Sequence, residues 1–404
     1  MSVLDNQVVR QCLSLLPLQD FVAPILDYRK QKLTTVNVLK IFIAAQMLKW
    51  PSLDFIEKQI RSDVHLQAEF GISSISKSQI SRRINGLPDE IPQALFHAVV
   101  HQIREHPDMS IAGVAQPLAL VDSTNIRLPF QLADWAYATK HRSGVKVHTR
   151  LMVIDKGKAY PDKIVSSTGN VSDYEGSDPL VVDRDVLYVM DRGYVCYKRM
   201  ERWVTDHIDF VMRVNGHHYA EILKEHDTPP TDSFIRRDAS VLMGNNPSTN
   251  MKSELRMIEF VDDKGRSYRL VTTRWDLPAK EITEIYRQRW LIELFFKWMK
   301  QHLRFAQLYS YQPNAVWNHI YLALVTYGLS YLIKLKTQSK KSCWDVLVLI
   351  RIYAQKLWSQ LEEELYRIPS KTSKGRQKRE GPPKQLMAGP TDVALVKPSR
   401  KQKR

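Results

Sequence analysis

The chain has 404 residues, of which 44% are hydrophobic, and it carries a formal net charge of +16 at pH 7. This length allows roughly two or three domains with a sizeable core, and the charge predicts a polyanionic partner, nucleic acid before an anionic membrane surface. Cys12, Cys196 and Cys343 form no C-x-x-C pair, which argues against a disulfide framework or a cysteine-based zinc site. The N-terminus lacks the pattern of a signal peptide, so we expect a soluble protein of a reducing cytoplasm.

Residues 1–108 have the pattern of a helical region. In "TTVNVLKIFIAAQMLKW", Thr34 or Thr35 is a plausible N-cap and an apolar stripe follows it. The segment "GISSISKSQISRRINGLP" predicts a short helix that begins near Ser76 and ends at Gly86.

That short helix is polar and basic. Its expected exposed side chains are Lys77, Ser78, Gln79, Arg82 and Arg83, around buried Ile80 and Ile84. A helix of this kind after a turn is what a helix-turn-helix recognition element requires, because such side chains reach phosphates and base edges. We therefore expect Lys77, Arg82 and Arg83 to contact DNA. A basic surface helix without a DNA role is the competing interpretation.

From about residue 115 the pattern changes to strands. Short apolar runs lie in "PLALVDSTNIRL", "VKVHTRLMVID", "DVLYVMDRGY", "IDFVMRVNG" and "SYRLVTTRW". Residues 206–270 carry several turns rich in proline, glycine and asparagine, which predicts a β-rich insertion with loops.

Helical periodicity dominates residues 279–366. The apolar run "VWNHIYLALVTYGLSYLI" predicts a core helix rather than a membrane span, because it contains Asn318 and His319. From Ser370 to the end, eleven lysines and arginines face two acids, and this basic tail is predicted to be disordered. More than half of the net charge lies there, which weakens the charge argument for the folded part.

Two aspartates each end an apolar run. Asp122 ends "LALVD", and Asp191 ends "VLYVMD". Functional groups of α/β sheets gather at the carboxyl ends of strands, where side chains leave the sheet. An aspartate after a strand is also an ordinary turn residue, and the residue type alone favours that interpretation.

The segment "YRQRWLIELFFKWMKQHL", residues 286–303, predicts one amphipathic helix. Its polar face holds Tyr286, Arg289, Trp290, Glu293, Lys297 and Lys300, and its apolar face holds Leu291, Ile292, Leu294, Phe295, Trp298 and Met299. The helix therefore presents one carboxylate among cations while its back can anchor in a core. A solvated face with an i,i+4 pair between Glu293 and Lys297 is the alternative.

Asp122, Asp191 and Glu293 together can hold two Mg²⁺ ions, with Mn²⁺ as a possible substitute, because such ions prefer oxygen ligands. Two ions about 4 Å apart can activate an attacking oxygen and stabilise the leaving oxygen at a phosphodiester. Cations beside the carboxylates suit DNA, which brings negative charge. We therefore predict that these three acids are catalytic metal ligands.

These residues resemble a known family, the DDE transposases of bacterial insertion sequences that carry the signature Y-x2-R-x3-E-x6-K. Here the signature is Tyr286, Arg289, Glu293 and Lys300, with every spacing intact. The stretches "VDST" and "MDRGY" look like the blocks around the family's two catalytic aspartates. The resemblance covers roughly residues 115 to 335.

The resemblance implies an α/β fold: a ribonuclease H-like catalytic domain at 115–366 with its β-rich insertion at 206–270. A helical N-terminal DNA-binding domain at 1–108 precedes it, and a basic tail at 367–404 follows. The implied activity is cut-and-paste transposition. Water attacks the phosphodiester at a transposon end, and the freed 3′-hydroxyl then joins target DNA.

The resemblance also implies roles for single residues and for partners. Tyr286, Arg289 and Lys300 bind phosphates near the cleaved end, and Arg192 is a further candidate phosphate contact. Trp290 or Trp275 can stack on an unpaired base if the end passes through a hairpin, whereas residue type alone favours core packing. The expected partners are terminal inverted repeats, target DNA and a second copy of the chain, in a nucleoid-associated complex.

Two alternatives remain open at this point. A non-catalytic DNA-binding protein derived from a transposase would use only the N-terminal helix and the tail. A metal-dependent nuclease without strand transfer would use the same three acids.

Overall fold

The computed structural model describes residues 7–109, 116–155, 158–226, 234–246 and 250–367. Apart from residue 367, the basic tail that is predicted to be disordered lies outside the described residues.

The N-terminal region is helical, as the sequence predicts. Its elements are α1 (Val8–Leu13), η2 (Leu18–Phe21), α2 (Thr35–Met47), α3 (Leu53–Ser62), α4 (Val64–Phe70), α5 (Lys77–Asn85), α6 (Glu90–Arg104) and η3 (Pro107–Met109). The Thr34 side chain caps α2 by accepting a hydrogen bond from the Asn37 amide. Ser76 and Gln79 form a capping box at the start of α5, and Gly86 ends that helix. The helix predicted near Ser76 is therefore confirmed.

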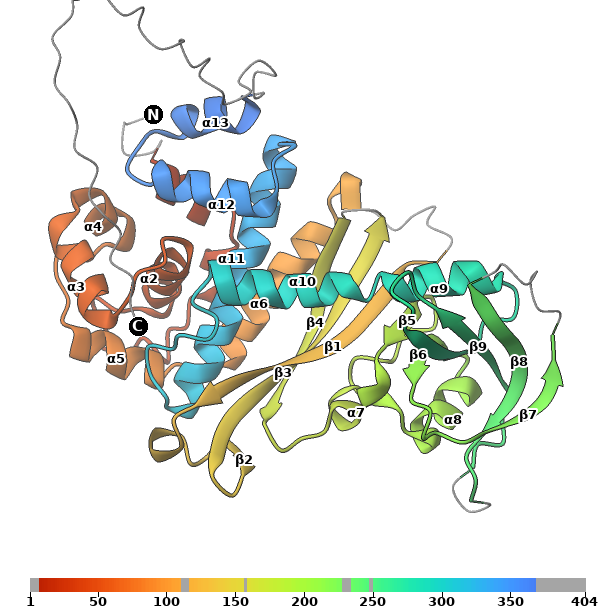
Figure 1. Cartoon of the computed structure of the whole chain (residues 1–404). Helices are drawn as coiled ribbons and strands as arrows, with labels where there is room; N and C mark the ends of the chain where they lie inside the picture. The colour runs from red at the N-terminus through yellow and green to blue at the C-terminus, as the bar shows by residue number, and fades with distance from the viewer. Residues whose placement is uncertain (1–6, 110–115, 156–157, 227–233, 247–249, 368–404) are drawn as a thin grey trace, which may run out of the picture. The chain divides into compact units, whose positions relative to one another are not determined.

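A sheet of ten strands, counted over the described residues, forms the middle of the chain (Figure 1). Its strands are β1 (Leu118–Leu128), β2 (Tyr137–Thr139), β3 (Arg142–Asp155), β4 (Lys158–Thr168), β5 (Leu187–Met190), β6 (Asp209–Val214), β7 (Ala220–Glu225), β8 (Ile235–Met243), β9 (Leu255–Val261) and β10 (Ser267–Thr272). The order is β2-β3-β1-β5-β6-β10-β9-β8-β7, and β4 pairs with β3. Strand β1 is antiparallel to β3 and parallel to β5, and β5 is parallel to β6.

All five apolar runs of the sequence form strands, so the mixed α/β architecture is confirmed. Strands β7, β8 and β9 lie within 206–270, and they continue the same sheet through β10. Strand β4 escapes sequence analysis because "KAYPDKIVSST" contains Pro161. Proline is tolerated there because β4 pairs on one side only, and the ladder with β3 shifts register beside it.

The remaining helices pack on the sheet and on one another. They are η4 (Phe130–Leu132), α7 (Asp173–Gly176), η5 (Arg192–Tyr194), α8 (Tyr197–Thr205), α9 (Ala279–Arg287), α10 (Trp290–His302), α11 (Pro313–Thr337), α12 (Cys343–Ile352) and α13 (Trp358–Tyr366). Helix α11 is buried along most of its length and packs against α2, α5, α6 and α12, so the predicted core helix is confirmed. Among the described residues, no helix combines the length and the apolar character that a membrane crossing needs.

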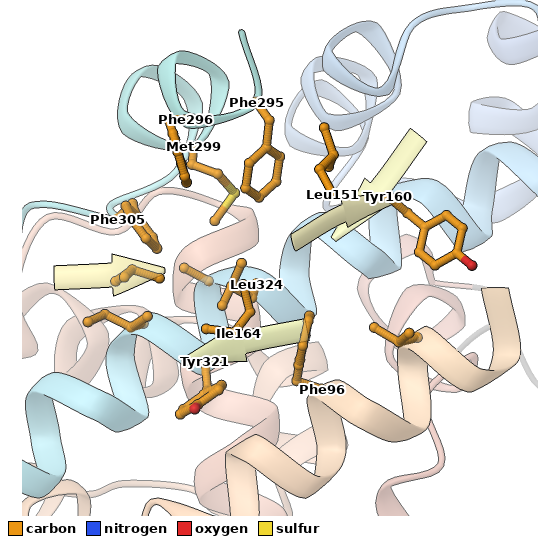
Figure 2. Close-up of a cluster of buried hydrophobic side chains, with 14 of the residues drawn as sticks. Phe96, Leu151, Tyr160, Ile164, Phe295, Phe296, Met299, Phe305, Tyr321 and Leu324 are labelled. Carbon is orange, nitrogen blue, oxygen red and sulfur yellow. The ribbon is translucent and has the colours of Figure 1, made fainter. Parts of the chain in front are cut away.

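A hydrophobic cluster joins the sheet to the helices beside it (Figure 2). It contains Phe96 of α6, Leu151 of β3, Tyr160 and Ile164 of β4, Phe295, Phe296 and Met299 of α10, Phe305, and Tyr321 and Leu324 of α11. One face of α10 is thereby fixed in the core, which holds the flanking Glu293 in a defined position.

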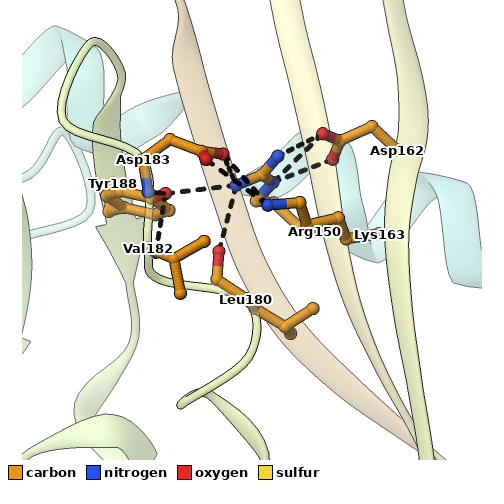
Figure 3. A network of polar contacts seen from close by, with 7 residues as sticks. All are labelled: Arg150, Asp162, Lys163, Leu180, Val182, Asp183 and Tyr188. Atoms are coloured by element: carbon orange, nitrogen blue, oxygen red, sulfur yellow. Dashed lines mark hydrogen bonds and ion pairs between the residues drawn. The ribbon is translucent and has the colours of Figure 1, made fainter.

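Arg150 of β3 is a buried cation within a polar network (Figure 3). Its side chain is 4% exposed, and that of its partner Asp162 is 6% exposed. Arg150 also forms an ion pair with Asp183 and donates a hydrogen bond to the Tyr188 hydroxyl at 3.1 Å. Burial acts to lower the pKa of Arg150, but the hydrogen bond and charge of Asp162 outweigh it and raise that pKa above its ordinary value. The network ties β3 to β4 and to the segment before β5.

We expect Arg150→Met to lower the free energy of unfolding by about 3–5 kcal/mol, because it leaves the Asp162 carboxylate buried without its partner. Urea unfolding followed by circular dichroism measures the loss. Arg266→Met is the control, since Arg266 and Asp262 form an ion pair at the surface and should contribute little. Equal losses in the two variants would contradict the assigned role of the buried network.

Candidate active site

The parallel ladder of β1 and β5 brings two predicted aspartates together. Its last pair is Val121 with Met190, and the next residues on the two strands are Asp122 and Asp191. Neighbouring strands lie about 5 Å apart, so the two backbones are close at this point. The sequence suggests that Asp122 ends its strand. In the structure β1 continues beyond Asp122, because β3 keeps pairing with it as far as Leu128.

The segment predicted as one helix is divided into α9 and α10. The break lies at Gln288 and Arg289, where the Leu291 amide bonds to the Gln288 carbonyl in a tighter turn. The prediction of an uninterrupted helix is wrong here, and the helical phase changes at the break. Within α10 the buried face also differs from the expected one: Leu294, expected to be buried, is 43% exposed, whereas Phe296 is buried.

Arg289 lies between two of the predicted catalytic acids. Its NH1 is 3.6 Å from Asp122 Oδ2, and its NH2 donates to Glu293 Oε1 at 2.6 Å. The Tyr286 hydroxyl donates to Asp191 Oδ1 at 3.1 Å. Asp122 thus contacts Arg289 at the break between the helices, and Asp191 contacts Tyr286 in the last turn of α9.

Asp122 sits in an environment that disfavours its charge. Its side chain is 23% exposed, and burial raises the pKa of Asp122 to about 6. The Ser123 amide and the Arg289 guanidinium oppose this rise in pKa, whereas negative charge on Asp191 and Asp173 adds to it. A cation near this carboxylate therefore relieves an electrostatic cost.

Tyr286 and Arg289 remain hydrogen-bond donors toward the acids. Burial and the adjacent Asp191 raise the pKa of the Tyr286 hydroxyl above its ordinary value, so this hydroxyl stays protonated. Burial acts to lower the pKa of Arg289, but Tyr286, Glu293 and Asp191 outweigh it and raise that pKa. The Nε of Arg289 is buried and has no hydrogen-bond partner among the described residues, so the guanidinium has donor capacity left.

In the described part of the chain, no group of three or more His, Cys, Asp or Glu side chains is arranged to hold a metal ion. The convergence of Asp122, Asp191 and Glu293 on one metal site is therefore not formed in this arrangement, where Arg289 lies between two of the three. The donor set itself fits a hard divalent cation, because all three side chains offer carboxylate oxygens and Asp191 acts to raise the pKa of Asp122.

Ser123, the residue after Asp122, belongs to a second polar cluster that the sequence does not indicate. Ser123 Oγ donates to Asp173 Oδ1 at 2.7 Å, and Lys146 Nζ is 3.1 Å from the same oxygen. Asp173 follows the capping residue Ser172 and has the pattern of an ordinary helix start. The one local signal is Lys146, a cation that alternates with the apolar Val145 and Val147 in β3.

The two tryptophans proposed for base stacking lie at the surface. Trp290 is 58% exposed and Trp275 is 45% exposed, so core packing is wrong for both. A pocket of about 420 Å³ opens beside the α9–α10 turn. Its lining includes Arg213, Tyr268, Tyr286, Arg287, Arg289 and Trp290.

The other proposed phosphate contacts near the acids are exposed. Lys300 lies in the last turn of α10. Neighbouring side chains partly shield its ammonium from water, and this lowers the pKa of Lys300 below its ordinary value. Arg192 lies directly after Asp191, and its NH1 donates to Asn215 Oδ1 at 3.3 Å. Arg213, which sequence analysis misses, is 4.0 Å from Asp191.

The N-terminal candidates are divided by the structure. Gly71, with a φ of 63°, turns the chain between α4 and α5. On α5, Lys77 and Arg82 are exposed as expected. The expectation that Arg83 is exposed is wrong: its side chain is 7% exposed and forms an ion pair with Asp27. The carboxylate holds this guanidinium inside the protein and away from solvent.

Comparisons with known proteins identify the family of this chain. Residues 115–329, more than half of the chain, match the family model described as Transposase DDE domain. The chain is 28% identical over 313 residues to a probable transposase for insertion sequence element IS5377 of Geobacillus stearothermophilus, which covers 76% of this chain and 79% of that protein. A piggyBac transposase in a synaptic complex with hairpin DNA is similar over 91% of this chain and 82% of that chain, with a TM-score of 0.43 and 13% identity.

The chain therefore belongs to the Transposase DDE domain family. It is a transposase of the insertion-sequence type, an enzyme class that acts on DNA and depends on divalent metal ions.

The raised pKa of Asp122 predicts how stability changes with pH in metal-free buffer. Because the folded state binds this proton more tightly than the unfolded state, the stability it contributes is present below about pH 4 and is lost as pH rises through about 6. Asn does not titrate, so Asp122→Asn should gain about 3 kcal/mol relative to wild type between about pH 4 and pH 7.

Urea unfolding at several pH values measures this difference. Asp276→Asn is the control of opposite sign, because a hydrogen bond from Arg274 lowers the pKa of that exposed carboxylate. If Asp122→Asn and wild type show parallel pH profiles, Asp122 titrates like a solvent-exposed acid and the electrostatic description of the site is incorrect.

Proposed function

We propose that this protein is a cut-and-paste DNA transposase that cleaves DNA at transposon ends and joins the freed ends to target DNA. The observation that carries the proposal is a set of contacts beside β1 and the end of β5: Arg289 touches Asp122 and Glu293, and Tyr286 touches Asp191. Each of the three acids thus contacts Tyr286 or Arg289 of the signature.

In the first reaction, a water oxygen forms a bond to phosphorus at the transposon end, and the bond from phosphorus to the 3′ oxygen breaks. The attacking oxygen loses a proton and the leaving 3′ oxygen gains one, which gives a 5′-phosphate and a 3′-hydroxyl. In the second reaction, this 3′ oxygen bonds to a target phosphorus and displaces a target 3′ oxygen in the same way.

Asp122, Asp191 and Glu293 are the proposed ligands of two Mg²⁺ ions, for which Mn²⁺ can substitute. When bound, such ions activate the attacking oxygen and stabilise the leaving oxygen. The support in this chain is the carboxylate set and the position of Asp122, which is buried and near Asp191. In the described arrangement the Arg289 guanidinium lies beside Asp122 and Glu293, where a metal ion is proposed to bind.

The cations around the acids are proposed to bind the phosphates of the DNA end. Arg289 brings a guanidinium beside Asp122 and Glu293, and charged donors of this kind bind phosphate oxygens strongly. Tyr286 offers a hydroxyl, and Lys300 and Arg192 offer exposed charges. Trp290, exposed beside the pocket of about 420 Å³, is proposed to stack on a base if the end forms a hairpin.

The proposal extends to the architecture. Residues 115–366 act as a ribonuclease H-like catalytic domain. The strand order β4-β3-β1-β5-β6, with Asp122 in β1 and Asp191 directly after β5, supports this. Residues 1–108 recognise the inverted repeats through α5, and two copies of the chain act together on paired ends, in a nucleoid-associated complex. The signature Y-x2-R-x3-E-x6-K supports the proposal that the chain belongs to the corresponding group of insertion-sequence transposases.

Glu293→Gln tests the catalytic role. The change is nearly isosteric but removes the negative charge, so strand cleavage should fall by more than roughly 100-fold. Loss of a residue that only hydrogen-bonds to a metal ligand already lowers activity or metal affinity by about 10- to 100-fold. Binding to the DNA end should persist. Arg289→Ala and Lys300→Ala remove phosphate contacts instead and should weaken binding, with cleavage partly recovered at low salt.

The measurement is a gel shift and a nicking assay on one labelled end with Mg²⁺, at two salt concentrations. Glu284→Gln is the matched control, because Glu284 is an exposed glutamate of α9. Nicking by Glu293→Gln at the wild-type rate would exclude Glu293 as a catalytic residue, and absence of nicking by wild type would leave the non-catalytic DNA-binding function in place. Nicking by wild type without joining to target DNA would identify a nuclease.

A further inference from the structure

A basic groove lies between α5 and the loop that precedes α2. It has a volume of about 460 Å³, and its cations are Arg29, Lys30 and Lys32 from the loop and Arg82 from α5, besides the buried Arg83. Among the described residues that line it, none is acidic. Three cations within four consecutive residues thus face a fourth across the groove.

These four cations have no ion pair with a carboxylate of the described residues. The Lys30 ammonium donates to the Leu26 carbonyl, and Lys32 Nζ donates to the Ser74 carbonyl at 3.4 Å. The Arg29 guanidinium lies 5.2 Å from the centre of the Tyr28 ring. Such contacts position the charges without neutralising them, so the groove keeps a positive potential.

A buried ion pair anchors the loop against α5. Arg83 is paired with Asp27 at one end of the loop, and its Nε donates to the Leu33 carbonyl at 3.0 Å at the other end. Its NH2 also donates to Thr35 Oγ1 at 3.0 Å, at the start of α2. Between these ends, Arg29 has a φ of 58°, a left-handed conformation that a non-glycine residue adopts only under constraint.

We propose that this groove grips the phosphate backbone of duplex DNA beside α5, which makes residues 28–32 a second DNA-contacting element. The inference rests on the proposed function, in which α5 meets DNA. A recognition helix fixes its register through phosphate contacts on its flanks, and unpaired cations on two chain segments supply them. Arg83 acts as a positioning residue, because one guanidinium holds both ends of the loop.

The test compares two full-length variants with wild type by fluorescence anisotropy on duplex DNA across a salt series. Arg29→Ala/Lys30→Ala/Lys32→Ala removes the loop cations. Lys224→Ala/Arg236→Ala/Lys340→Ala is matched in charge and removes exposed cations elsewhere. Each lost phosphate contact lowers the slope of log K against log salt by about 0.9, so the loop variant should lose about 3 in slope.

At about 0.1 M salt the loop variant should bind DNA roughly 10- to 100-fold more weakly, to the same extent on transposon-end and random duplexes. The matched variant should keep nearly the wild-type slope. Equal salt slopes for the two variants would overturn the proposal. So would a loss of affinity that appears only when RNA replaces the duplex DNA, or only when inorganic phosphate competes with it. Both variants should still nick DNA at low salt; wild type that binds DNA but never nicks would count against the transposase instead.

Arg83→Lys tests the positioning role, because lysine keeps the charge but cannot contact Asp27, Leu33 and Thr35 together. The salt slope should fall toward that of the loop variant at temperatures well below unfolding. A purely structural role would lower the unfolding temperature and leave the slope of the folded protein unchanged, and that result would exclude Arg83 as a positioning residue.

Discussion

Burial of helix α11 is the constraint on which both candidate functional regions, α5 and the α10 segment with Glu293, depend. At one point Asn318 Nδ2 donates to the carbonyl oxygens of Ile84 and Leu87, at 2.9 and 2.8 Å, and so satisfies the end of α5. Two turns further on, the Tyr327 ring packs edge-on against Phe295 of α10, with 5.1 Å between ring centres. The helix with exposed basic residues and the helix with Glu293 therefore share one rigid support.

Most buried polar atoms of α11 side chains find a partner, which makes these residues compatible with burial, although Asn318 Oδ1 has none among the described residues. His319 lies against Gln46, with 3.1 Å between His319 Nε2 and Gln46 Nε2, and the other end of the Gln46 amide accepts a hydrogen bond from the Arg304 amide at 3.0 Å. Burial lowers the pKa of His319 to about 4, so the ring is neutral near pH 7. Paired amides and a neutral imidazole add specificity to the packing of α11 without burying a charge.

Two arginines illustrate how one residue type serves different purposes. Arg289 is 14% exposed, contacts two carboxylates and retains a free Nε within the described structure, so it can exchange partners when an anion arrives. Arg83 is 7% exposed and uses its donors on Asp27, Leu33 and Thr35, so exchange would expose a buried carboxylate. Arg289 therefore keeps one hydrogen-bond donor unused, whereas Arg83 is a fixed anchor.

Elements whose signals are local can be predicted from the sequence. Strand runs, the capping residues Thr34 and Ser76, the core helix and the spacing from Tyr286 to Lys300 depend on neighbours a few residues away, and they predict the mixed fold and the candidate acids. Which side chains face solvent, and which of them meet, depends instead on how the chain packs. Asp27 and Arg83 are 56 residues apart, and no local pattern marks them as partners. The break at Arg289, the adjacency of the two aspartates and the loop beside α5 likewise depend on contacts between distant segments, which form only when the chain packs.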